Sequence, residues 1–159
     1  MDATDRRILD FLQSDASLTV KEIADQVHLS TTPCWKRIQK MEESGFIRAR
    51  VALLDPDKVN AGVTVFVAIK ASQHSRDWID RFHEAVAALP EIMEAYRMSG
   101  DIDYLLRVAV RDIGAYDRFY KKLIDRIHLS DVTSSFAMEQ IKYTTALPIN
   151  LNDNVSQMA

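Results

Sequence analysis

Cysteine is nearly absent from this chain, and long apolar runs are missing altogether. The one cysteine among 159 residues, Cys34, can form no intrachain disulfide and offers no cysteine cluster for structural zinc. No apolar stretch approaches the roughly 20 residues of a membrane-spanning helix, and residues 1–7 lack the pattern of a secretory signal. We therefore expect a cytoplasmic protein without membrane contact, stabilised by packing and association.

The usual signatures of enzymes are missing as well. The four histidines are scattered over different predicted elements, and no nucleophile–base pair, metal-ligand spacing or glycine-rich phosphate loop is present. The sequence thus predicts no catalytic residues, no metal and no cofactor. A composite site assembled only by folding is the remaining enzymatic alternative.

The formal net charge of −3 is distributed unevenly. Residues 1–30 carry three basic and six acidic side chains, whereas residues 31–50 carry five basic and two acidic ones. A short basic face beside an acidic remainder is typical of a protein that contacts DNA with one element. A solvated helix face explains the same charges equally well, so charge alone leaves both interpretations open.

Helices are predicted at the start of the chain. Residues 4–14 carry apolar side chains at helical spacing, with Asp2 or Thr4 as the cap. Thr19 and Glu22 are spaced as a capping box, in which each side chain accepts a hydrogen bond from the other residue's amide. This box predicts that a second helix begins one residue after Thr19.

The third helix follows after a very short connection. Only residues 28–30 separate it from the second helix, too few for anything but a tight turn. Ser30 is placed to cap it, Pro33 falls in its first turn, and Gly45 is placed to end it in a left-handed conformation. The spacing predicts a helix-turn-helix.

The two faces of this third helix differ sharply. Cys34, Ile38 and Met41 recur at core spacing, so we expect Cys34 to be a buried thiol rather than a redox sensor. The outer face suits insertion into the DNA major groove, since a large aromatic among hydroxyls, an amide and cations is unusual for a plain surface. The alternative is that the aromatic ring packs under the next strand. The predicted base-reading residues are Thr31, Thr32, Trp35, Lys36 and Gln39.

Residues 46–54 alternate as a strand and end at a turn, so they predict a linker strand between two domains. Arg48 and Arg50 share one side of it, where they either contact DNA phosphates or simply face solvent. We assign phosphate contacts to four cations: Arg37, Lys40, Arg48 and Arg50.

The rest of the chain repeats a strand and helix pattern. Its order is βαββαβ, which builds a four-stranded antiparallel sheet with both helices on one face, a ferredoxin-like α+β sandwich. The open sheet face carries apolar side chains and favours a dimer. The predicted elements are a strand at 63–71, a helix at 75–89, strands at 94–98 and 104–110, a helix with its stripe at 116–127, and an extended segment at 132–144.

Three motifs in this order resemble the Lrp/AsnC (leucine-responsive and asparagine regulator) family. They are residues 29–38 (LSTTPCWKRI), 45–47 (GFI) and 99–104 (SGDIDY). The resemblance spans nearly the whole chain. It implies a transcription regulator with an N-terminal winged-type helix-turn-helix, and a C-terminal domain that binds amino acids or related metabolites and forms dimers, commonly assembled to octamers.

The resemblance also places an effector loop at residues 99–104. Gly100 lets the backbone approach a ligand, and Asp101 or Asp103 can hold an α-ammonium group. The alternative is that these residues form an ordinary hairpin turn, in which the aspartates accept hydrogen bonds from local amides. The predicted effector-binding residues, with two flanking side chains for the pocket, are Met98, Ser99, Gly100, Asp101, Asp103, Tyr104 and Phe136.

Residues 51–56 (VALLDP) and 136–145 (FAMEQIKYTT) are similar to a subgroup of the family that is associated with cysteine and sulfur amino-acid catabolism. This similarity implies L-cysteine as effector, bound at an oligomer interface. We expect a helix-turn-helix at 1–46, a linker at 47–61, an effector and oligomerisation domain at 62–145 and a tail at 146–159. The expected partners are double-stranded DNA, an amino acid and further copies of the chain. The rival function is a low-specificity architectural DNA-binding protein.

Overall fold

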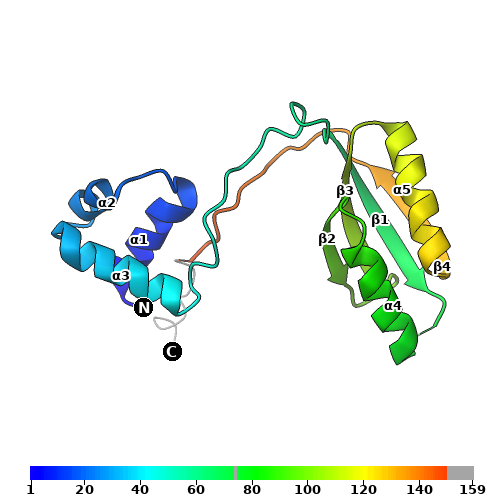
Figure 1. Ribbon diagram of the computed structural model, residues 1–159, viewed down its shortest axis with the longest axis horizontal. Helices are drawn as coiled ribbons and strands as arrows, with labels where there is room; N and C mark the ends of the chain where they lie inside the picture. Colours follow the sequence, from blue (N-terminus) through cyan, green and yellow to red (C-terminus); the bar gives the residue numbers. More distant parts are fainter. Residues whose placement is uncertain (74, 150–159) are drawn as a thin grey trace. The chain divides into compact units, whose positions relative to one another are not determined.

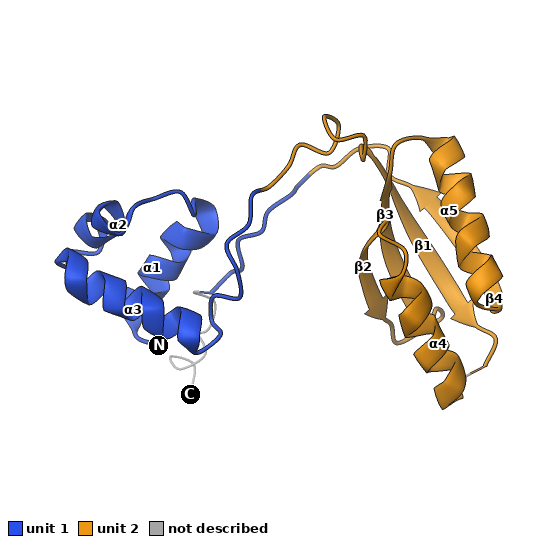
Figure 2. Cartoon of the chain, viewed as in Figure 1, with its two compact units in different colours: residues 1–52, 142–159 blue, residues 53–141 orange. Residues whose placement is uncertain are grey.

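The computed structural model describes residues 1–73 and 75–149, and it divides into two compact units (Figures 1 and 2). The first unit contains Met1–Ala52 together with the chain from Lys142 onward, and the second contains Leu53–Ile141. The chain therefore leaves the first unit, builds the second and returns. The sequence-based end of the effector domain, at residue 145, falls inside this returning segment.

Among its described residues, the first unit has three helices: α1 (Ala3–Ser14), α2 (Val20–Gln26) and α3 (Thr31–Glu43) (Figure 1). The tight turn before α3 includes His28 with a φ of 57°, and Gly45 follows α3 with a φ of 77°. The left-handed end predicted for α3 is therefore confirmed. The apolar stripes of the three helices meet in one core: Ile8, Leu12, Ile23, Ala24, Val27, Cys34, Ile38 and Met41.

Side-chain caps define where α1 and α2 begin. Asp2, rather than Thr4, caps α1, and Asp5 completes a capping box with it. The predicted box of Thr19 and Glu22 is present at the start of α2. Ser30 occupies the N-cap position of α3 with extended backbone, but its side chain makes no cap hydrogen bond, so this part of the prediction is wrong.

The linker strand predicted at residues 46–54 is not a strand in this structure. Ile47 still packs against the helical core and donates its amide to the Met41 carbonyl at 3.2 Å, but residues 48–55 have no regular secondary structure. A strand needs a partner for its backbone N–H and C=O groups. Among the described residues, no other segment pairs with this one. Alternation of side chains alone therefore did not produce a strand.

The second unit has the predicted βαββαβ order. Its sheet is antiparallel throughout, with strand order β2-β3-β1-β4, and both helices cover one face (Figure 1). The elements are β1 (Val63–Ala71), α4 (Arg76–Ala87), β2 (Ile92–Arg97), β3 (Tyr104–Val110), α5 (Ile113–Arg126) and β4 (Leu129–Phe136). The ferredoxin-like α+β fold is confirmed.

Alternation along the central strand β1 sets the two faces of this sheet. Val65, Val67 and Ile69 are fully buried under the helices, whereas Phe66, on the opposite face, is 40% exposed. The core on the helix side also contains Phe82 from α4 and Phe119 from α5. One face of the sheet is thus packed, and the other is open in a single chain.

The last strand is shorter than predicted. β4 ends at Phe136, whereas the sequence predicts extended chain to residue 144. The partner of β4 is β1, which begins at Val63, and the last hydrogen bond of this pairing runs from the Ala137 amide to the Thr64 carbonyl at 3.0 Å. Beyond that point β4 has no neighbour, so the chain continues without strand structure.

Candidate DNA-reading surface and ligand loop

Burial of one face of α3 determines which side chains the opposite face exposes. Cys34, Ile38 and Met41 are at most 4% exposed, which anchors one side of the helix in the core. Trp35 is 50% exposed, so it does not pack under the following segment. The predicted base-reading side chains share this outward side, all exposed except the half-buried Gln39: Thr31, Thr32, Trp35, Lys36 and Gln39.

The basic side chains near this face fall into two groups. Lys36, Lys40 and Arg48 are exposed, and no ion pair involves them within the part of the chain that the structure describes. Arg50 instead pairs with Glu42, its Nη2 lying 2.9 Å from the Glu42 Oε1. The four cations assigned to phosphate are therefore not equivalent, because some already have a protein partner.

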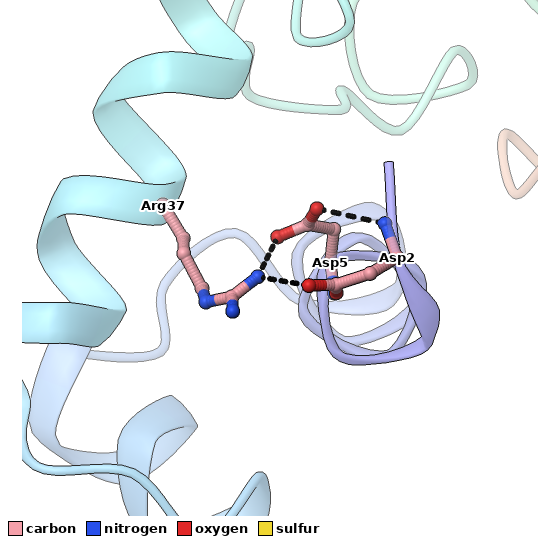
Figure 3. Close-up of polar contacts among 3 residues, drawn as sticks. All are labelled: Asp2, Asp5 and Arg37. Carbon is pink, nitrogen blue, oxygen red and sulfur yellow. Dashed lines mark hydrogen bonds and ion pairs between the residues drawn. The ribbon is translucent and has the colours of Figure 1, made fainter.

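Arg37 is the most extensively paired of these cations. Its Nη1 lies 2.6 Å from the Oδ2 of Asp2 and 2.7 Å from the Oδ1 of Asp5 (Figure 3). These hydrogen bonds, that from Asp2 first, raise the pKa of the Arg37 guanidinium. The pKa of Asp2 is lowered by the Asp5 amide and then by Arg37. The structure thus pairs this guanidinium with two carboxylates at the N-terminus of α1, so a contact with phosphate would require it to leave them.

A groove of about 580 Å³ lies beside this cluster, lined by the first residues of α1 and the second half of α3. Asp5 of α1 and its N-cap, Asp2, line one side, and Lys36, Arg37 and Lys40 of α3 line the other. The groove therefore has carboxylates on the α1 side and ammonium groups on the α3 side, next to the outward face of α3.

Cys34 belongs to the helical core, as the sequence predicts. Its side chain is fully buried, and burial raises the pKa of its thiol. A buried thiol with a raised pKa is a poor nucleophile. Within residues 1–73 and 75–149, no three His, Cys, Asp or Glu side chains cluster as a metal site would require.

The predicted effector loop is a closed turn between β2 and β3. The Met98 amide donates to the Asp103 carbonyl at 2.8 Å, and the Asp103 amide donates to the Ile69 carbonyl at 2.9 Å. Gly100 has a φ of 124°, and a Cβ built on it would meet nothing within 4 Å. Glycine is therefore needed here for its backbone conformation and not for space. Ser99, Gly100 and Asp101 are exposed.

Asp103 has a structural partner in β1. Its Oδ2 accepts the Ala71 amide at 2.8 Å, at the point where the pairing of β1 with β4 shifts register. The hairpin interpretation, in which an aspartate accepts from a nearby backbone amide, therefore describes Asp103 well. Asp101 lies two residues earlier in the loop and is exposed.

Two of the predicted effector residues lie away from the loop surface. Tyr104 is buried under α4, with its ring centre 4.2 Å from that of Phe82. Phe136 pairs with Val65, six residues before Ala71 on β1, and its ring contacts Tyr116 of α5 edge-on at 5.1 Å. At roughly 3.3 Å per residue, this separation along β1 is about 20 Å. Within one chain, Tyr104 is therefore enclosed in the core, and Phe136 lies far along the sheet from residues 99–101.

Two family models cover most of the chain. Residues 1–48 match a winged helix-turn-helix DNA-binding domain, and residues 64–147 match the Lrp/AsnC ligand binding domain. The DNA-binding transcriptional activator DecR of Escherichia coli (strain K12) is 51% identical, over 94% of this chain and 99% of its own length. The chain belongs to the Lrp/AsnC family. It is a DNA-binding transcription regulator, and the family consists of regulators rather than enzymes.

Solved structures of Lrp/AsnC proteins share the fold. An AsnC family transcriptional regulator from Agrobacterium tumefaciens is 63% identical with a TM-score of 0.92, covering 94% of this chain and 98% of that one. The transcriptional regulator NMB0573 from Neisseria meningitidis, solved as a complex with L-Met, is 34% identical with a TM-score of 0.90, covering 94% and 97%. In this chain, no helix among the described residues is both long and apolar enough to span a bilayer.

Sequence reasoning missed the long-range polar contacts of this Lrp/AsnC chain. Asp2 was predicted only as a possible cap, and Asp5 was given no role. The one signal for their contact with Arg37 was the position of Arg37 beside the buried stripe of α3. Gln13 was not singled out. Its side-chain amide donates to the Leu147 carbonyl at 3.0 Å and accepts the Leu147 amide at 2.8 Å, which attaches the returning segment to α1. No pattern in the sequence predicts this contact.

Proposed function

We propose that the chain is a sequence-specific regulator whose DNA binding responds to an amino acid held by the loop at residues 98–103. The observation that carries the proposal is the outward face of α3. It exposes an indole, two hydroxyls and an ammonium group from a helix whose other side is buried. This combination suits base edges in a major groove better than it suits water.

The side chains of α3 divide by chemistry into contacts with bases and with phosphates. Lys36 suits the acceptors of guanine, Gln39 suits adenine, and the apolar ring of Trp35 suits a thymine methyl group. Lys40 and Arg48 flank them as phosphate contacts, which set affinity and register without reading sequence. Arg50 would first have to exchange Glu42 for a phosphate.

Self-association would cover the open face of the sheet. Phe66 is 40% exposed and Tyr96 51% exposed on that face, beside an ion pair of Arg107 with Glu94 at 2.6 Å. A two-fold dimer presents two copies of α3, so its half-sites lie about one helical turn of DNA, or a multiple, apart.

Phe66→Asp should weaken the dimer in sedimentation equilibrium. Ile113→Asp, on α5 and 72% exposed, is the matched control that should leave it intact.

The amino-acid effector is supported by the loop and by the ligand-binding match over residues 64–147. The exposed Asp101 carboxylate suits an α-ammonium group, and the backbone around Gly100 can approach the ligand closely. Asp103 would support the loop through its bond to the Ala71 amide. Tyr104 lies in the core, and Phe136 would contribute only if a second copy placed it beside the loop.

L-cysteine is the effector we propose first, because residues 51–56 and 136–145 are similar to the cysteine-catabolism subgroup. The L-Met complex of the Neisseria relative is a precedent for a sulfur amino acid on this fold. The buried Cys34 takes no part, since it lies in the core of the helix-turn-helix.

A thermal-shift screen against the amino acids tests the sensor. A ligand at one hundred times its dissociation constant adds about 2.7 kcal/mol of stability. We expect a shift with L-cysteine that Asp101→Asn removes and that Asp80→Asn, an exposed aspartate of α4, retains. No shift with any amino acid would refute the proposed effector class.

Selection of duplexes from a random library tests sequence specificity. Enrichment of one sequence with repeated half-sites is the expected result. Equal binding of all duplexes, with a steep salt dependence, would instead support the architectural, low-specificity function.

A further inference from the structure

The first turn of α1 and the side of α3 form one closed polar network. Asp2 accepts the Asp5 amide with Oδ1 at 2.8 Å and Arg37 with Oδ2 at 2.6 Å. Asp5 accepts the Asp2 amide with Oδ2 at 2.9 Å and Arg37 with Oδ1 at 2.7 Å. Each of the four carboxylate oxygens therefore has a partner. The capping box holds both carboxylates independently of Arg37. Figure 3 shows the two bonds from Arg37 together with the bond from the Asp2 amide to Asp5.

We infer that Arg37 is a positioning residue: its bonds to Asp2 and Asp5 fix the rotation of α3 about its own axis and thereby aim the base-reading side chains. This inference rests on the proposed sequence-specific function. It assigns Arg37 to recognition of sequence, through Trp35, Lys36 and their neighbours, and not to contact with phosphate.

Apolar packing alone leaves this rotation loosely defined. The crossing angles that ridge-into-groove packing favours scatter by about 15–20° from one protein to another, and burial itself has no direction, so we take a rotation of similar size as the range that apolar packing leaves open. The side-chain tips of a helix lie about 5–6 Å from its axis, so a rotation of about 20° moves them by about 2 Å. Hydrogen bonds to base edges tolerate only a few tenths of an ångström. A directional contact between α1 and α3 narrows that range further.

Arg37 lies at the right place on α3 to supply that contact. It flanks the buried stripe of Cys34 and Ile38 on one side, and it adjoins the exposed Lys36 on the other. Its side chain is only 35% exposed, and that of Asp5 only 17%. Both bonds leave the same atom, Nη1, whose two hydrogens lie in the guanidinium plane and are directed at the two carboxylates, so a rotation of α3 would break them.

The charge of the network provides a sharp test. Asp2→Asn with Asp5→Asn makes the surface beside α3 two charges more positive. Simple electrostatics then predicts tighter binding to every duplex. Loss of positioning predicts weaker binding to the selected duplex and unchanged or tighter binding to a scrambled one. A matched control with the same change of charge is Asp25→Asn with Glu43→Gln, both exposed and outside the network.

The experiment measures dissociation constants of the full-length variants for the duplex selected by the wild-type chain and for a scrambled duplex of the same composition. We define discrimination as the dissociation constant for the scrambled duplex divided by that for the selected duplex. For Arg37→Ala and for the double aspartate variant, we expect this ratio to fall roughly tenfold, which is about the discrimination of one base contact. For Arg37→Ala, the slope of binding against salt should not change. Arg37→Lys keeps the charge, but an ammonium group lacks the plane that directs the two Nη1 hydrogens at Asp2 and Asp5, so it should restore the ratio only in part.

Other roles for Arg37 give different results. A phosphate contact would weaken both duplexes equally and lower the salt slope by about one unit. A purely structural role would reduce the folded fraction, which also affects both duplexes equally, and would lower the melting temperature. Either result, or a double aspartate variant that behaves like its control, overturns the inference. If the wild-type chain enriches no sequence, the proposed function itself fails, and Arg37 has no specificity to set.

Discussion

Removal of the Lys40 ammonium group tests the phosphate contact that we propose for this residue. Lys40 is exposed on α3, and within the described residues no carboxylate pairs with it, so Lys40→Ala leaves no charge unpaired. Each phosphate neutralised contributes about 0.9 to the slope of log K against log salt. Loss of one contact should therefore weaken binding about 15-fold at 0.05 M salt and about fourfold at 0.2 M, for each half-site bound.

Fluorescence anisotropy over this salt range, on the selected and the scrambled duplex, measures both slopes. We expect the same loss on both duplexes, because a phosphate contact carries no sequence information. Lys121→Ala, an exposed lysine of α5 in the other unit, changes net charge equally and should alter neither slope. A Lys40→Ala variant with an unchanged slope, or with a loss confined to the selected duplex, would refute this assignment.

Three further changes test other parts of the structure. Thr32→Ala should relax sequence preference at one position of the selected site with the salt slope unchanged, measured by repeating the selection. The hydrogen bonds from Arg107 and then Tyr96 lower the pKa of Glu94 below its ordinary value near 4.5. These bonds therefore stabilise the fold above that value, and their contribution is lost as the pH falls. The free energy of unfolding in urea should accordingly depend less on pH in acid for Glu94→Gln than for the wild-type chain. Phe119→Ala empties a fully buried site and should cost about 3–5 kcal/mol in urea unfolding, whereas a loss under 1 kcal/mol would contradict its core position.

Local chemistry made the helices and the element order predictable. The capping box of Thr19 and Glu22, the short turn before α3 and the stripe of Cys34, Ile38 and Met41 depend on contacts within a few residues. The alternation of β1 likewise separates its buried face from its open one. Because these signals lie in neighbouring residues, the outward face of α3 could be identified before the structure was known.

Other features depend on residues far apart in the chain. The partners of Arg37 lie 32 and 35 positions away, and an arginine on the flank of a helix has no local preference between a phosphate and a carboxylate. Tyr104 directly follows the loop, yet the pleat of β3 turns it under α4. The end of β4 depends on where β1 begins.

The sequence by itself determined the three helices of the first unit, the βαββαβ order of the second and the polar outer face of α3, because caps, turns and periodicity act over a few residues. Only the tertiary structure decided which cations face solvent and which aspartate of the loop binds a backbone amide of β1. It also decided that residues 46–54 do not form a strand. Charge pairing and strand pairing depend on which distant groups folding brings within hydrogen-bonding distance. Separation along the chain does not determine that distance in space.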